Sequence, residues 1–274
     1  MSRRDLASPV PPVLRPVIPF VPAILIIGCK LVLYPTGPGP WALGLVSGLL
    51  TALVALGLAL IYRANRILNF AQGDLGAVPT TLAVWLIAVS GLPYVVGVLL
   101  GLASAIVLGV VVDLAIVRRF FRAPRLLLTV ATIGLSQLLI VASIALPRLW
   151  HRREFLNETL PEPFQATVHI GTEVFHGSEL VALVVAPLLL VGLSILLRRT
   201  DIGIAVRASS ERGDRAALLG IPVRRLETVV WAVAATLSFV GVFLQASIFQ
   251  YSTGAAVSLQ ALTFAMVALV VGRM

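Results

Sequence analysis

Three polar residues, Asn69, Gln72 and Asp74, lie in the stretch RILNFAQGDLG (66–76), between two long apolar runs. The runs are WALGLVSGLLTALVALGLALIY (41–62) and GAVPTTLAVWLIAVSGLP (76–93). Amide and carboxylate groups in this position either form a polar turn or work inside a membrane, where they bind freed backbone groups or contact a passing solute. The residue types alone leave both interpretations open.

Other polar residues in apolar surroundings are further candidates. Ser136 and Gln137 lie within the run TIGLSQLL, where the sequence is equally compatible with a contact between helices and with the lining of a pathway. Asp113 lies about one helical turn from the end of its run, and we expect it to pair with Arg118 or Arg119. Such an ion pair would have a structural role.

Patterns that would support catalysis are missing from the sequence. The single lysine, Lys30, is in GCKL rather than in a phosphate-binding loop, and no G-x-S-x-G elbow occurs. The three histidines lack metal-ligand spacing, and Cys29 alone cannot complete a zinc set or a disulfide framework. We therefore expect a protein that is not an enzyme and that holds no metal or cofactor.

The composition indicates that these residues are positioned by membrane-spanning helices. Of the 274 residues, 59% are hydrophobic and 12% are charged, and the mean hydropathy is +1.02. Soluble domains carry about 25% charged residues. Several apolar runs reach the ~20 residues that a helix needs to cross the hydrocarbon core. The pattern predicts an all-α, polytopic bundle of about eight transmembrane helices, at 17–34, 41–62, 72–90, 94–117, 126–146, 180–197, 229–249 and 256–272.

Basic residues are concentrated in alternate loops. Only Arg148, Arg152 and Arg153 fall in the loops of one side, and the other arginines fall on the opposite side. The positive-inside rule then makes the basic side, with both termini, cytoplasmic. The net charge of +9 therefore reports membrane topology, and we expect the lipid bilayer rather than nucleic acid as the surrounding partner.

The loops divide the chain into a Pro-rich N-terminus, expected to be disordered and cytoplasmic (1–16), and one transmembrane domain (17–274). The external loop (147–179) contains FQATVHI and TEVF, whose alternation predicts a small hairpin. The cytoplasmic loop (198–228) has a helical stretch that stops at Gly220 before Pro222. Its charged residues adjoin a small apolar set, Ala208, Ala216, Leu218 and Leu219, which predicts a short amphipathic helix under the membrane. The charged residues are Arg207, Glu211, Arg212, Asp214 and Arg215. The pattern of Ala216, Ala217 and Gly220 would let another backbone approach closely, although a solvated linker helix is the alternative.

Three ordered stretches resemble the permeases of bacterial branched-chain amino-acid ABC importers, of the LivH type. They are LVALGLALIYRANRILNFAQGDLGAV (53–78), AIVRRFFRAPRLLLTVATIGLSQLL (115–139) and GIAVRASSERGDRAALLGIPVRRLETVVWAVAATLSFVGVFL (203–244). The basic turn RRFFRAPR lacks the family's R-P pair, and the arginines of YRANRILN replace apolar residues of many relatives. The chain ends at LVVGRM, where relatives continue, so we expect a C-terminally truncated member.

The resemblance implies a permease subunit in the bacterial inner membrane, for branched-chain or related amino acids. Its partners would be two ATPase subunits, which hold ATP and Mg, a second, LivM-like permease and an extracytoplasmic binding protein. The cytoplasmic loop would be the coupling loop that docks on the ATPase, with its charged residues making the contact.

The resemblance also makes the motif of Asn69, Phe70, Gln72, Gly73 and Asp74 a helix interruption beside the pathway. Asn69 and Gln72 would satisfy freed backbone groups at the break. Asp74 would cap the next helix.

Other functions remain open at this point. A urea or short-amide importer would keep the same architecture, because permeases of very similar sequence carry those solutes. A self-contained secondary transporter or channel would instead place charged pairs or broken helices deep in the bundle. A membrane scaffold that transports nothing is a further alternative. Genes for ATPases and a binding protein beside this one would favour the importer.

Overall fold

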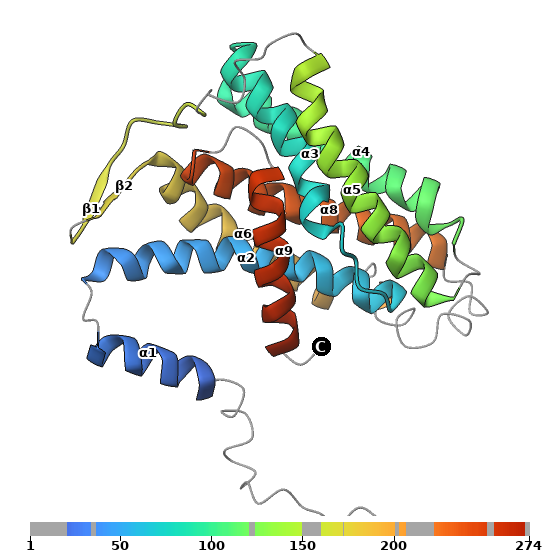
Figure 1. The fold of residues 1–274 in the computed structure, drawn as a ribbon, viewed down its shortest axis with the longest axis horizontal. Coiled ribbons are helices and arrows are strands. Elements are labelled where there is room, and N and C mark those ends of the chain that lie inside the picture. The colour runs from blue at the N-terminus through green and yellow to red at the C-terminus, as the bar shows by residue number, and fades with distance from the viewer. Residues whose placement is uncertain are drawn as a thin grey trace, which may run out of the picture.

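The computed structural model describes residues 21–33, 37–120, 124–149, 160–171, 173–200, 203–206, 222–250 and 255–271. It is a helical bundle with one small hairpin, and Figure 1 shows its elements. In chain order these are α1 (Val21–Leu33), α2 (Pro38–Asn65), α3 (Gln72–Val84) with the π-helix η2 (Trp85–Val89), α4 (Tyr94–Val112) with the π-helix η3 (Asp113–Val117), α5 (Arg125–Leu149), β1 (Val168–Ile170), β2 (Glu173–Phe175), α6 (Gly177–Arg199), α8 (Val223–Ile248) and α9 (Ala255–Val271).

Each of the eight predicted spans contains a helix, so the all-α polytopic fold is confirmed. Among the described residues, six helices are long and apolar enough to cross a membrane, namely α2, α3 with η2, α4 with η3, α5, α6 and α8. The other two, α1 and α9, are shorter, with 13 and 17 residues. The six long apolar helices make the chain a multi-pass membrane protein.

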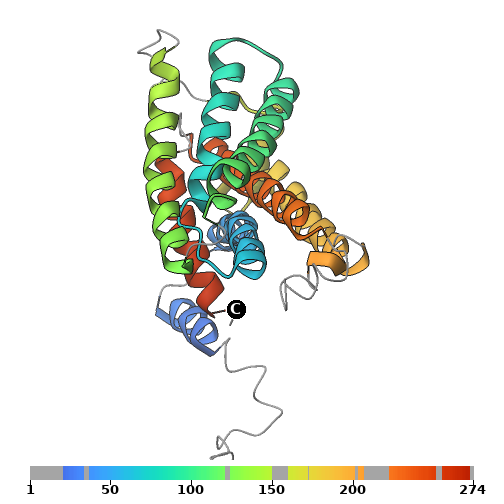
Figure 2. The same ribbon diagram turned by 90° about the vertical axis from the view of Figure 1, so that its right-hand side faces the viewer.

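Helix α8 lies at the centre of the bundle. It packs against α2, α3 and α4, and Figure 2 shows it (orange) crossing between α2 (blue) and the pair α3 and α4 (cyan to green). Its Trp231 and Phe239 are among the largest fully buried side chains in the described part of the chain. The core therefore forms around α8, although the hydropathy of this helix is lower than that of α4 or α6.

Glycines allow α3 and α4 to approach α8 closely. A Cβ atom on Gly76 of α3 would meet the backbone of Ser238 and Phe239, and one on Gly109 of α4 would meet that of Trp231 and Ala232. Helices in membranes gain van der Waals contact where small residues let their backbones approach. The sequence positions of these glycines thus set the close helix crossings in the core.

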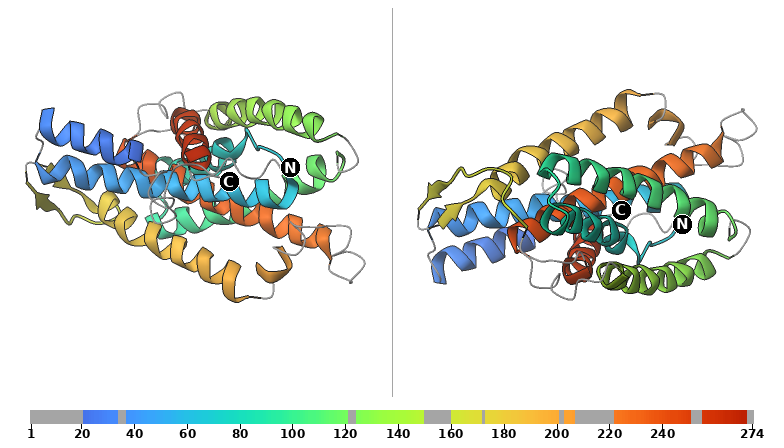
Figure 3. Two further views of the ribbon diagram at one scale, coloured as in Figure 1. Left: turned by 90° about the horizontal axis from the view of Figure 1, so that it is seen from below. Right: turned by 90° about the horizontal axis from the view of Figure 1, so that it is seen from above.

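The hairpin predicted within residues 147–179 is confirmed. Strands β1 and β2 pair antiparallel, with Val168 opposite Phe175 and Ile170 opposite Glu173. The hairpin lies against the start of α2, where Gly39 is in close contact with Glu173. Figure 3 shows the hairpin at the same end of the molecule as the beginning of α2. Helix α1 also lies beside α2 there, with the Lys30 Nζ 4.8 Å from the centroid of the Trp41 ring.

Candidate functional site

The chain breaks its helical path between α2 and α3. Helix α2 ends at Asn65, and Arg66 adopts a left-handed conformation with a φ of 55°. The Asn69 side chain accepts a hydrogen bond from the Ala71 N–H at 3.1 Å and donates one to the Gln72 side chain at 3.2 Å. Asn69 therefore satisfies a backbone group of the break itself, and it is completely buried.

Gln72 makes long-range contacts with α8. Its Nε2 donates to the Ala234 carbonyl at 3.1 Å and lies 3.2 Å from the Ser238 hydroxyl, which donates in turn to the Gln72 carbonyl. Gly57 of α2 leaves room for this amide, since a Cβ there would meet the Gln72 Nε2. The prediction that Gln72 satisfies freed backbone groups at the break is therefore wrong. Its amide nitrogen instead joins α3 to α8, because the buried side of α3 faces that helix.

Asp74 lies in the first turn of α3 but does not cap it. No side chain caps α3, so the prediction of an Asp74 cap is wrong. The carboxylate instead points across the bundle and accepts a hydrogen bond of 2.5 Å from the Ser136 hydroxyl of α5, with Ser258 of α9 beside it. An acidic residue in a first turn still interacts favourably with the positive end of the helix dipole.

The other residues of the motif join the same packing. The Phe70 N–H donates to the Thr132 hydroxyl of α5 at 3.2 Å, and a Cβ on Gly73 would meet the Ser258 carbonyl of α9. Gln137, by contrast, is exposed on α5. We call the buried hydrogen-bonding set the polar core; it comprises Asn69, Gln72, Asp74, Thr132, Ser136 and Ser238. The polar core joins α3 to α5 and α8.

A second polar cluster joins α4 to the start of α8. Asp113, which is fully buried, accepts hydrogen bonds from the Thr228 hydroxyl at 2.6 Å and from the Arg118 Nε at 3.3 Å. The Arg118 Nη2 also donates to Thr228 at 2.9 Å. The predicted pairing of Asp113 with Arg118 is thus confirmed.

We expect Asp113→Ala to lower the free energy of unfolding by about 2 kcal/mol, because it removes two hydrogen bonds to a buried charge. The loss stays below the 3–5 kcal/mol typical of a broken buried pair because Arg118 is 38% exposed and can be hydrated. Denaturation of the purified protein in detergent measures the effect. Arg119→Ala, a change at the exposed neighbour, is the control. Equal stability of the two variants would contradict the assigned role of Asp113.

A cavity of about 440 Å³ opens between α2, α8 and α9. We call it the groove, and its lining residues are Ser47, Gly48, Thr51, Ala52, Gln245, Phe249, Gln260, Phe264 and Ala268. No residue of the polar core lines it. The groove was not predicted from the sequence, although Gln260, Phe264 and Ala268 follow each other at the four-residue spacing of one helix face.

The predicted coupling loop (198–228) lies only partly within the described residues. Residues 207–221 lie outside the described residues, and they include Arg207, Glu211, Arg212, Asp214, Arg215, Ala216, Ala217 and Gly220. The two ends of this loop are nevertheless positioned by α6 and α8. Within the described ranges, no group of three or more His, Cys, Asp or Glu residues could hold a metal ion.

The fold and these sites define a multi-pass helical membrane protein with polar groups between its helices. Residues 42–274 match the family described as branched-chain amino acid transport system / permease component, and the chain belongs to that family.

Two relatives illustrate the similarity. The probable branched-chain amino acid transport permease protein LivH of Methanocaldococcus jannaschii is 31% identical over 191 residues, which cover 69% of this chain and 60% of the relative. The high-affinity branched-chain amino acid transport system permease protein BraD of Pseudomonas aeruginosa is 25% identical over 214 residues, which cover 73% of this chain and 68% of the relative. The chain thus spans about three fifths to two thirds of the length of these relatives. No solved structure matches it.

Proposed function

We propose that this chain is a membrane-spanning permease subunit of an ATP-driven importer, which moves branched-chain or related amino acids across the bacterial inner membrane. The observation that carries the proposal is the family match over residues 42–274. The two relatives, both named as branched-chain amino-acid permeases, support the choice of cargo.

In such an importer, subunits other than this chain would hydrolyse ATP. Two ATPase subunits would hold ATP and Mg, a second, LivM-like permease would complete the pathway, and an extracytoplasmic binding protein would deliver the amino acid. When ATP closes the ATPase dimer, the permease conformation that fits the closed dimer gains population. This chain then contributes helices and docking surfaces and needs no cofactor of its own.

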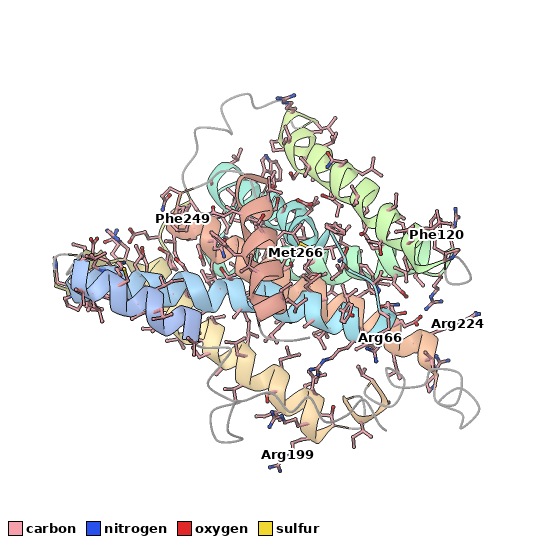
Figure 4. All side chains as sticks on the ribbon, turned by 60° about the horizontal axis from the view of Figure 1, so that its bottom comes forward. Arg66, Phe120, Arg199, Arg224, Phe249 and Met266 are labelled. Atoms are coloured by element: carbon pink, nitrogen blue, oxygen red, sulfur yellow. The ribbon has the colours of Figure 1, made fainter. Side chains whose placement is uncertain are left out.

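We also propose an orientation for the bundle. Figure 4 shows Arg66, Arg199 and Arg224, which follow α2, end α6 and begin α8, on one side of the molecule. We call this side the basic end. The positive-inside rule supports a cytoplasmic location for the basic end, for both termini and for the coupling loop (198–228). The hairpin lies at the other end of α2 and would face the binding protein.

Association with the ATPase tests this proposal. The paired change Arg212→Ala with Gly220→Asp is expected to reduce co-purification of the ATPase at least tenfold, because it removes a charged contact and blocks a close approach. Membrane insertion is expected to persist. Lys30→Ala, a change far from the coupling loop in sequence, serves as the matched control. Unchanged association of the paired variant would count against the docking role.

A further inference from the structure

We propose that the groove is a passage site for a small zwitterion with an apolar side chain, such as an aliphatic α-amino acid. The inference rests on the proposed function and deepens it by naming where the cargo is bound. It is carried by an unpartnered amide in a cavity between membrane helices.

Gln245 is the residue that points to a ligand. Its side chain is 6% exposed and lines the groove, and no hydrogen bond joins its amide to another described residue. The amide is not among the fully enclosed polar groups without a partner, so its polar atoms face the groove. A polar group inside a membrane is expensive and marks a pathway when it faces a water-filled cavity. The Gln245 amide is therefore available for water or for a polar solute.

The remaining lining residues suit the two parts of an amino acid. The hydroxyls of Ser47 and Thr51 and the amide of Gln260 supply neutral donors and acceptors for a carboxylate and an ammonium group. Phe249 and Phe264 offer apolar surface to an aliphatic side chain. A solute is thus offered polar contacts and apolar contacts within one cavity.

The groove has no charged lining residue, which favours passage of a solute over tight binding. Every lining residue is uncharged, so a zwitterion would meet dipoles instead of ion pairs. Conduction requires binding that is favourable enough for entry and weak enough for release. The cavity volume also falls within the roughly 300–1,000 Å³ of small-molecule sites.

The groove has a definite place along the proposed pathway. Gln245 lies near the C-terminal end of α8, whose other end begins at the basic end, and Ser47 lies in the first half of α2. Both positions are in the half of the bundle away from the basic end. Under the proposed orientation, the groove would receive cargo from the binding protein before the pathway reaches the cytoplasmic side.

The first test is import by the complete complex in vesicles. Gln245→Leu is expected to reduce leucine uptake at least tenfold while the complex still assembles, because the amide is lost and the volume is nearly kept. Thr263→Val is the matched control: Thr263 is exposed on α9, bonds within its own helix at 2.8 Å and does not line the groove. Its uptake is expected to stay unchanged.

The second test is chemical accessibility in a Cys29→Ser background, which removes the single native thiol. Cysteines introduced by Ser47→Cys and Gln260→Cys are expected to react with a water-soluble thiol reagent, and 1 mM leucine is expected to slow the reaction at least threefold. Leu188→Cys, at a position that is 69% exposed on α6, is expected to be unreactive because lipid covers it.

The outcomes separate this inference from the proposed function. No ATP-dependent import by the unaltered chain would overturn the importer and, with it, the cargo of the groove. Normal uptake by Gln245→Leu in an importer that works would overturn the groove alone. Unreactive cysteines would mean that lipid fills the groove, and reactive cysteines that leucine does not protect would mean that only water enters; both results would overturn the passage site.

Discussion

Gly76→Ala is expected to lower the free energy of unfolding by about 3 kcal/mol, the upper end of the usual cost of overpacking. The added methyl group would meet the carbonyl of Ser238 and would lie 2.9 Å from the Phe239 nitrogen. Both atoms belong to the backbone of the central helix α8. This helix is packed against α2, α3 and α4, so it cannot shift without disturbing those contacts. Thermal unfolding of the detergent-purified protein measures the loss.

The matched control for this prediction is Gly192→Ala. Gly192 lies within α6, and a Cβ there would have no heavy atom within 4 Å. Replacing a mid-helix glycine by alanine in open space stabilises by roughly 0.5–1 kcal/mol. The two substitutions should therefore change stability in opposite directions. A Gly76→Ala protein as stable as Gly192→Ala would show that α3 and α8 are not in close backbone contact.

Gln72→Leu is expected to cost about 3 kcal/mol of stability, because several buried partners lose their hydrogen bonds at once. The partners are the Ala234 carbonyl, the Ser238 hydroxyl and the Asn69 amide. The volume changes little, so the loss reports hydrogen bonding rather than packing. We expect reduced accumulation of folded protein, measured by fluorescence-detected size exclusion, with no change in which solute the surviving protein carries.

A double-mutant cycle makes the Gln72 prediction specific. Ser238→Ala removes one partner, and adding it to Gln72→Leu should cost less than the sum of the single effects, since the two side chains share one contact. Gln165→Leu, at an exposed position, controls for loss of an amide in general. Additive effects at positions 72 and 238 would refute a direct bond between the two side chains.

Much of the fold follows from the sequence because apolar runs of membrane length have few alternatives to helices. Residues 94–117 agree with α4 and η3 throughout. Helix α8 differs from its predicted span, because it begins at Val223 and the prediction began at residue 229. Its first turns contain Arg224, Arg225 and Glu227, which hydropathy excludes from a membrane span although Glu227 is buried against neighbouring helices.

The sites were harder to predict than the helices because their contacts are long-range. The motif identified Gln72 and Asp74 as unusual, but only the fold reveals that their partners are on α8 and α5. The groove was missed for a related reason. Gln245 and Gln260 are unremarkable singly, and no sequence pattern places them beside Ser47 before the three helices are assembled.

The most direct test of the importer assignment is leucine uptake by vesicles that contain the full complex, with this chain present or omitted. We expect uptake only when this chain, ATP and the binding protein are all supplied, and unlabelled leucine should compete at least tenfold better than urea. Uptake that is unchanged without ATP or without this chain would contradict the account, and stronger competition by urea would reassign the cargo.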